Sequence, residues 1–313
     1  MKRAAMVVVT LLVVAWAMAQ ATPQAQQTPP AGQAGTPQAG TAQAGAAAAP
    51  AQGKRPPQAK SQAEFNDYLA ASKETDPAAI EKAATDFDTK YPQSELRILL
   101  YKSAMHSYQN ANNGSKMSEM ADKVLKLDPD DPEALLAASE VIAERTRDTD
   151  LDKDQRYEEA SKEAQHALTT IDTDVAVPAG TPQERVDAYK GLLRSSLYSV
   201  LGTIDFNEEK YPDAETLLRK SIDAYPAQPD PVVVLRLAIA LDKQGKYPEA
   251  LKQANTAVEM TQDNTSTGTL ARRERDRLVQ LTGGTPNSTP APTAKPPASS
   301  PQPSSPQPSS PPH

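Results

Sequence analysis

Apolar side chains recur at helical spacing through the middle of the chain, most clearly in residues 231–264. A row of small residues at i, i+4 and i+7 in the second half of this stretch consists of Ala250, Ala254 and Ala257. Ala238 lies in the preceding apolar run, and small residues let two helix backbones approach closely. Gly245 suits the positive φ that ends a helix, and Pro248 suits the first turn of the next. The stretch therefore predicts two antiparallel helices.

The pattern recurs upstream. Residues 195–228 carry Tyr198, Leu201, Gly202, Tyr211, Ala214, Leu218 and Pro226. Residues 98–131 carry Tyr101, Ala104, Tyr108, Ala121, Val124 and Pro129. A helix–turn–helix of about 34 residues, with a leucine and a small residue in its first helix and spaced alanines in its second, resembles a tetratricopeptide repeat. The resemblance implies an all-α, right-handed α-solenoid of about five hairpins with a C-terminal capping helix.

The predicted solenoid covers residues 61–281. Its units lie at about residues 61–94, 95–131, 132–174, 181–228 and 231–264, followed by a cap at 265–281. The third unit fits when its turn carries an insertion. Gln262 stands where the family has a proline, and no unit carries the family's tryptophan. Residues 87–94 are similar to the repeat ends of outer-membrane assembly lipoproteins and envelope coordinator proteins, although those lipoproteins need a cysteine that this chain lacks.

Several helix boundaries follow from local sequence. The pairs Asp76-Pro77 and Asp131-Pro132 each predict an N-cap followed by a first-turn proline. Residues 181–184, TPQE, predict a capping box that opens a long helix. Residues 172–180 contain proline and glycine without periodicity, so they predict a loop and the weakest joint of the solenoid.

The N-terminus predicts export. Residues 1–19 combine basic Lys2 and Arg3, an apolar stretch and the cleavage signature Ala-Met-Ala, which is the pattern of a signal peptide. Cleavage would leave Gln20 first and no stable membrane span. An uncleaved anchor is the alternative, but the apolar stretch is shorter than the ~20 residues that cross a bilayer. We expect a periplasmic or secreted protein.

Two arms of biased composition flank the solenoid. Residues 20–60 are rich in Ala, Gln, Pro and Gly without apolar periodicity, which predicts a disordered linker. Residues 282–313 are rich in Pro and Ser, and this tail suits either a spacer or a ligand for a partner's groove.

Charge and cysteine content narrow the function classes. All 40 acidic residues but only 27 of the 33 basic ones lie in residues 61–281, which gives the solenoid a net charge of about −13. An acidic solenoid repels phosphate backbones, so we expect no nucleic acid partner. The chain has no cysteine, which excludes a disulfide and a lipid-modified cysteine.

Candidate chemistry is sparse. His106 and His166 lie on predicted helices without metal-ligand spacing, and no catalytic constellation accompanies them, so we expect neither an enzyme nor a cofactor. The predicted insertion places Asp148, Asp150, Asp152 and Glu159 at calcium-loop spacing. Lys153 stands where such a loop needs glycine, so a solvated acidic loop is the favoured interpretation and no metal site is predicted.

Binding is the remaining function class. The resemblance implies that the first helix of each unit lines a concave groove, and in this sequence these positions are Lys102, His106, Asn110, Leu136, Glu140, Glu144, Ser199, Thr203, Asn207, Leu235 and Ile239. Phe65 and Leu69 occupy first-unit positions where a carboxylate clamp would need lysine or asparagine. We expect a non-catalytic scaffold for a protein or an extended peptide, plausibly in envelope assembly. The alternative is a structural envelope component held through its Pro-rich tail, and the oligomeric state is left open.

Overall fold

The computed structural model describes residues 53–178 and 180–283, and this part of the chain is 73% helical and without strands. Its eleven helices are α2 (Gln62–Ala71), α3 (Pro77–Lys90), α4 (Arg97–Asn110), α5 (Gly114–Leu127), α6 (Pro132–Arg145), α7 (Lys153–Asp174), α8 (Gln183–Asn207), α9 (Tyr211–Ala224), α10 (Pro231–Lys243), α11 (Tyr247–Glu259) and α12 (Ser266–Leu281). None of them is long and apolar enough to cross a membrane.

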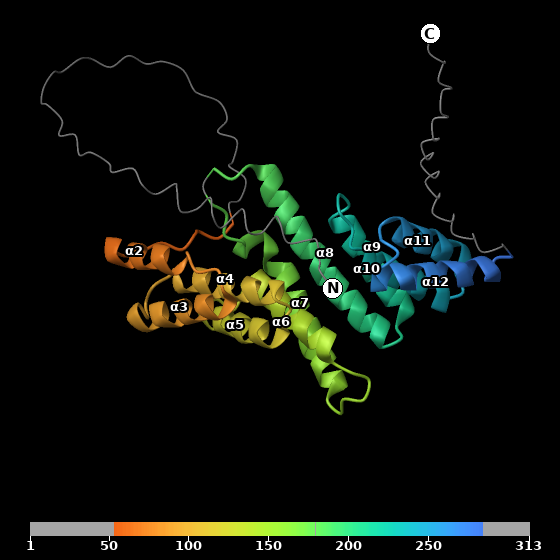
Figure 1. Cartoon of the computed structure of the whole chain (residues 1–313), viewed down its shortest axis with the longest axis horizontal. Helices are drawn as coiled ribbons and strands as arrows, with labels where there is room; N and C mark the ends of the chain where they lie inside the picture. Colours follow the sequence, from red (N-terminus) through yellow and green to blue (C-terminus); the bar gives the residue numbers. More distant parts are fainter. Residues whose placement is uncertain (1–52, 179, 284–313) are drawn as a thin grey trace, which may run out of the picture.

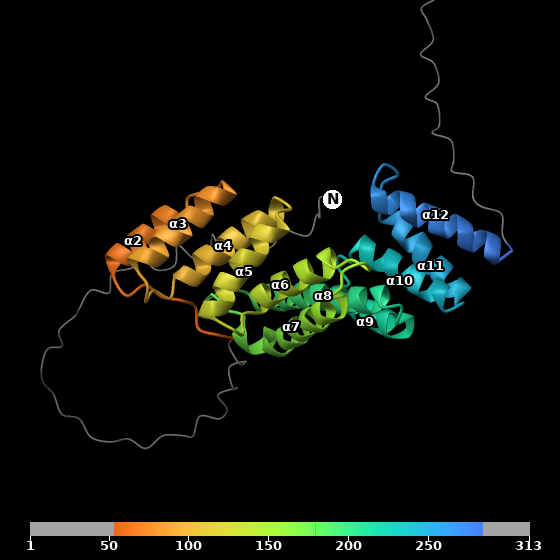
Figure 2. The same cartoon turned by 90° about the horizontal axis from the view of Figure 1, so that it is seen from below.

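Consecutive helices pair into hairpins. α2 packs on α3, α4 on α5, α6 on α7, α8 on α9 and α10 on α11, and each hairpin also packs on the next. α12 covers α11 and α10 at the C-terminal end. Figures 1 and 2 show the hairpins following one another along the long axis of the molecule. The all-α solenoid of about five hairpins with a capping helix is therefore confirmed.

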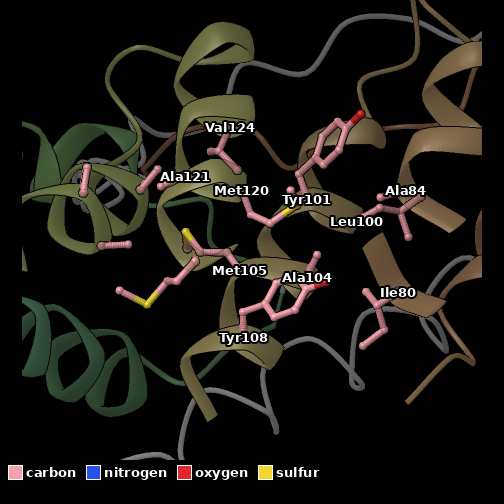
Figure 3. Close-up of a cluster of buried hydrophobic side chains, with 14 of the residues drawn as sticks. Ile80, Ala84, Leu100, Tyr101, Ala104, Met105, Tyr108, Met120, Ala121 and Val124 are labelled. Atoms are coloured by element: carbon pink, nitrogen blue, oxygen red, sulfur yellow. The ribbon is translucent and has the colours of Figure 1, made fainter. Parts of the chain in front are cut away.

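The interior is thin and relies on small side chains. Ala250, Ala254 and Ala257 have no exposed surface, as the close packing of α11 on α10 and α12 requires. Between α3, α4 and α5, larger side chains such as Leu100 and Met105 fill the space around Ala104 (Figure 3). Because each cluster of buried side chains is shared by neighbouring helices, every hairpin depends on the next for its buried surface.

Local sequence signals explain most helix ends. The carboxylates of Asp76, Asp131 and Asp230 each accept backbone N–H groups at the start of a helix whose first turn holds a proline. Gly245 has a φ of 74° after α10, the left-handed conformation that glycine adopts without strain. The ends at Asp76, Asp131 and Gly245 agree with the predictions made from the sequence, and the start at Asp230 is a further example.

The predicted capping box at residues 181–184 does not form. α8 begins at Gln183 with Pro182 at the N-cap, and no side chain caps this end. Thr181 lies one position too early, and its hydroxyl donates instead to the carbonyl oxygen of Pro178 at 2.8 Å. The long helix itself is present, with 25 residues.

The predicted loop at residues 172–180 is shorter and better packed than its composition suggests. α7 continues to Asp174, and the side chain of Val175 is buried beside α7 and α8. The Arg194 guanidinium donates to both carboxylate oxygens of Asp172 at 2.6 and 2.7 Å, and Lys190 donates to the Asp172 carbonyl at 3.1 Å. These contacts join α8 to the end of α7. The predicted weak joint between the third and fourth hairpins is therefore held by hydrogen bonds from α8 as well as by the buried side chain of Val175.

Residues before Ser61 are also part of the described structure. Residues 53–60, which we call the strap, have no helix of their own and lie against the first three hairpins, next to the loop that follows α7 (Figure 1). The linker prediction for these eight residues therefore differs from the structure. The predicted signal peptide, residues 20–52 and the tail from residue 284 lie outside the described residues.

Candidate functional site

The strap is held by charged side chains. Lys54 Nζ donates to Asp128 Oδ2 at 2.5 Å, and to Asp174 Oδ1 at 3.4 Å. Arg55 donates to Glu95 Oε1 at 2.7 Å, and Glu95 Oε2 accepts the backbone N–H of Gln58 at 3.0 Å. The strap thus bridges the segment before α4 and the C-terminal ends of α5 and α7.

The acidic side chains under Lys54 form a cation-binding position. Oxygen atoms of Asp128, Asp130 and Asp174 lie within 4.8 Å of one another, and Asp128 and Asp174 lie within hydrogen-bonding distance of the Lys54 ammonium. Partial burial opposes the charge on Lys54, but the hydrogen bonds and charges of the two aspartates outweigh it and raise the pKa of Lys54. The Lys54 ammonium thus lies beside a group of carboxylates that favours its charged form.

An apolar pocket lies beside this acidic position. Its volume is about 110 Å³, and its apolar lining includes Pro56, Pro57, Tyr68, Leu99, Val186 and Tyr189. The two prolines of the strap and residues 175–178 thus face the inner helices α2, α4 and α8 across one small cavity. Proline rings against aliphatic and aromatic side chains are the contacts that such a pocket offers to an extended chain.

A buried ionic network forms the polar side of the pocket. Lys102 Nζ donates to Asp131 Oδ2 at 2.9 Å and to Glu133 Oε1 at 2.7 Å, while His106 Nε2 lies 3.0 Å from Glu133 Oε2. Burial disfavours the charge on Glu133, but Lys102 and His106 outweigh it and lower the pKa of this carboxyl. Burial raises the pKa of the Tyr189 hydroxyl well above its ordinary value, and the Glu133 charge adds to this.

The network is a cluster of ion pairs between α4 and the start of α6. Ser103 also lines the pocket, but among the described residues no hydrogen bond joins its hydroxyl to His106, whose Nε2 faces Glu133. A hydrolytic site would need that hydroxyl held against the imidazole as its base. The arrangement therefore positions α4 against α6 and gives the pocket a polar wall.

The structure brings together only part of the predicted groove set. Lys102 and His106 line the pocket, whereas Asn110 is exposed at the C-terminal end of α4. On α6, Leu136 is half-buried against the core, Glu140 accepts from Gln109 at 3.4 Å, and Glu144 is exposed.

The remaining positions of that set lie on α8 and α10, away from the pocket. Thr203 accepts a hydrogen bond from Arg236 at 2.8 Å, and its own hydroxyl donates to the carbonyl of half-buried Ser199. Asn207 donates to Tyr157. Leu235 is only 5% exposed and belongs to a core cluster with Ile239 half-buried against it, so Leu235 offers no surface to a partner.

Sequence reasoning missed the strap and the acids that hold it. Lys54, Arg55 and Lys60 are the only charged residues between positions 4 and 63, which was an available signal that this end of the linker differs from the rest. Their partners Asp128 and Asp174 lie 74 and 120 positions away from Lys54 in the sequence. No local pattern joins such residues.

The acidic insertion is arranged as a solvated loop before α7. Asp150 accepts the backbone N–H of Arg147 at 2.9 Å and a hydrogen bond from Arg156 at 3.4 Å, and Lys153 lies 3.7 Å from Asp148. Glu159 is on α7, and within the described ranges these carboxylates are not among those close enough to share an ion. Asp148 and Asp150 each have a positively charged side chain as their neighbour.

Comparison with known proteins gives structural neighbours only. No protein-family model and no curated protein sequence matches this chain. A search of solved structures finds YrrB, described as a TPR protein with an unusual peptide-binding site, at 17% identity and a TM-score of 0.42 over 64% of this chain and 84% of that one. PilF of Pseudomonas aeruginosa matches at 17% identity and a TM-score of 0.48, over 71% of this chain and 85% of that chain.

TTC0263, a TPR protein of Thermus thermophilus, matches at 15% identity and a TM-score of 0.41, over 67% of this chain and 98% of that chain. At these identities and scores, the assignment of the fold rests on the helices of this chain itself. With five stacked antiparallel hairpins and a capping helix, the chain is an all-α solenoid.

Proposed function

We propose that this chain is a non-catalytic scaffold that binds an extended peptide or protein segment on the surface covered by the strap. The observation that carries the proposal is the strap itself, because a stretch without regular structure already lies along this surface through side-chain contacts. Mostly apolar pockets with a few placed polar or charged groups are typical binding sites, and proline-rich extended segments bind in apolar grooves. The side chains of Lys102, Asp131 and Glu133 beside the pocket are paired with one another, which supports a binding role over a catalytic one.

The proposed setting is the periplasm or the outside of the cell, with a role in envelope assembly. The signal-peptide pattern of residues 1–19 and the similarity of residues 87–94 to envelope proteins support this setting. Fractionation of cells that make the full-length chain tests it, together with N-terminal sequencing of the mature protein. A mature chain that begins at Gln20 is the expected result, and retention of residues 1–19 in the membrane fraction contradicts it.

Capture of peptides from a defined random library by the full-length chain tests the binding role. Ser103→Arg places a large side chain in the pocket from α4, so we expect the enriched peptides to be lost. Thr89→Arg adds the same group at an exposed position of α3 and is expected to keep them. Equal enrichment by both variants would exclude this surface as the binding site. Loss of localisation on removal of residues 282–313, with capture unchanged, would favour the structural alternative.

A further inference from the structure

The strap contacts three hairpins although it contributes little to the core. Lys54 reaches the ends of α5 and α7, Arg55 reaches Glu95 before α4, and Lys60 donates to the carbonyl oxygen of Gln93 at 2.6 Å. Every basic side chain of the strap therefore meets an acidic side chain or a carbonyl oxygen. This is charge complementarity between a short basic segment and an acidic surface.

The strap is held on the surface mainly by weak, exposed interactions. The side chains of Lys54 and Arg55 remain 42% and 60% exposed, and exposed ion pairs are weak because water and salt screen them. Among the described residues, no backbone-to-backbone hydrogen bond joins residues 53–60 to the helices. A segment held in this way can leave the surface while the solenoid stays folded.

The surface limits the size of the residue at position 53 in addition to pairing with the charged residues of the strap. A Cβ atom on Gly53 would lie 2.3 Å from the carbonyl oxygen of Val175, so the strap passes this point only because position 53 has no side chain. Pro56 and Pro57, which follow Arg55, form part of the lining of the apolar pocket. Along the chain direction, the surface therefore fits a residue without a side chain, then a positively charged side chain and then prolines.

We propose that the strap is a built-in occupant of a peptide-binding site, and that the external ligand is an extended segment with lysine or arginine followed by prolines, which displaces it. The proposal rests on the function proposed above and names the chemistry of its partner. The cation takes the place of Lys54 beside Asp128 and Asp174, and the prolines take the places of Pro56 and Pro57 along the pocket opposite Leu99. The strap competes at the high effective concentration of a tethered segment, so the free chain binds such ligands weakly.

Fluorescence anisotropy with a labelled peptide of residues 53–60, GKRPPQAK, tests this in the full-length chain. Gly53→Val crowds the strap against Val175 without changing any charge, and Lys54→Glu/Arg55→Glu removes its anchors. We expect both variants to bind the peptide at least about tenfold more tightly than the unchanged chain, because competition from the strap is removed. A peptide with the lysine and arginine of positions 54 and 55 replaced by glutamate is expected not to bind.

A charge-matched control excludes general attraction of a basic peptide to an acidic protein. Lys82→Glu/Lys162→Glu makes the same change in net charge at exposed positions of α3 and α7 and is expected to leave peptide binding at the level of the unchanged chain. Adding Asp128→Asn/Asp174→Asn to the Gly53→Val chain is expected to reduce peptide binding by about tenfold or more, because the cation loses its partners.

Three outcomes would overturn the proposal: equal peptide affinity in the Gly53→Val chain and the unchanged chain, an equal gain in the charge-matched control, or binding that survives loss of the two aspartates. Circular dichroism confirms that each variant is folded. If the peptide fails to bind while Ser103→Arg still abolishes capture of library peptides, the partner chemistry is wrong and the proposed function stands. If neither experiment shows binding at this surface, both proposals fail.

Discussion

The first three hairpins bury more polar and charged side chains than the rest of the solenoid does. Of the seven buried polar or charged residues among those described, six lie between Glu64 and Thr170, and only Ser221 lies beyond them. The buried members of the C-terminal clusters are alanine, leucine and valine. The strap lies only on the polar half.

The difference separates two roles within one fold. Buried ionic side chains add little net stability compared with apolar packing. Stability therefore does not explain why they lie in the first three hairpins. In the first three hairpins this polarity borders the pocket and the acidic surface under the strap. The second half holds its helices by close contact of small side chains and extends the rod.

Removal of the buried cation should affect stability most. Lys102→Met leaves Asp131 and Glu133 without their counter-ion, and we expect a loss of about 3–5 kcal/mol in the free energy of unfolding at pH 7. The pKa of Glu133 is lowered in the folded state, so its stabilising contribution is present above its ordinary pKa and is lost as the pH falls through the folded value. The deficit of the variant should therefore shrink in strong acid.

Urea unfolding at pH 7 and at pH 3 measures this effect. Lys82→Met breaks an exposed pair with Asp86 one turn away and should change the free energy of unfolding by less than about 1 kcal/mol. Similar losses in the two variants would mean that the buried network is no more important than a surface ion pair.

A cavity among the C-terminal hairpins should lower the free energy of unfolding slightly less than Lys102→Met does. This loss should not depend on pH. Leu237 is 1% exposed within the cluster of α10, so Leu237→Ala is expected to lower the free energy of unfolding by about 2–3 kcal/mol. Leu270→Ala, at a half-exposed position of α12, should lower it by less than about 1 kcal/mol. A strong pH dependence of the Leu237→Ala loss would contradict the contrast between the two halves.

The sequence predicted features that depend on neighbouring residues but not those that depend on residues far apart. The alanine row in α11, the Asp-Pro helix starts and Gly245 act within a few residues, so pattern alone predicted the hairpins. The pairs that build the site join positions far apart, as Lys54 does with Asp174. Composition classed residues 53–60 with the linker, because neither charge nor proline content shows what surface a segment meets after folding.

One acidic side chain in the polar half should be destabilising at neutral pH. Burial, together with the charges of Glu159 and Asp122, raises the pKa of Glu163 from 4.5 to about 7. A raised carboxyl pKa means that the folded state prefers the protonated form, so stability falls as the pH rises from about 4.5 to about 7.

Glu163→Gln removes this charge and should raise the free energy of unfolding by about 1 kcal/mol at pH 8, a value reduced because the side chain is partly exposed. The gain should vanish below pH 4. Thermal unfolding across this range measures it, with Glu158→Gln on the exposed side of α7 as the control. A gain that persists in acid would show that packing, rather than charge, is responsible.

The smallest change in global stability is expected at the strap, where the informative measurement is local. Glu95 accepts hydrogen bonds from Arg55 and from the backbone N–H of Gln58, so Glu95→Gln weakens both. We expect less than about 1 kcal/mol in the free energy of unfolding, because the Arg55 pair is exposed.

Hydrogen exchange at the Gln58 amide should nevertheless rise by about tenfold in Glu95→Gln, since local opening governs the exchange of such a group. Glu158→Gln, which loses an exposed pair on α7, should leave this amide unchanged. If exchange at Gln58 rises only in proportion to global unfolding, the strap opens together with the first three hairpins and belongs to their structure. Independent opening instead makes the strap a separate segment whose place on the acidic surface another chain could take.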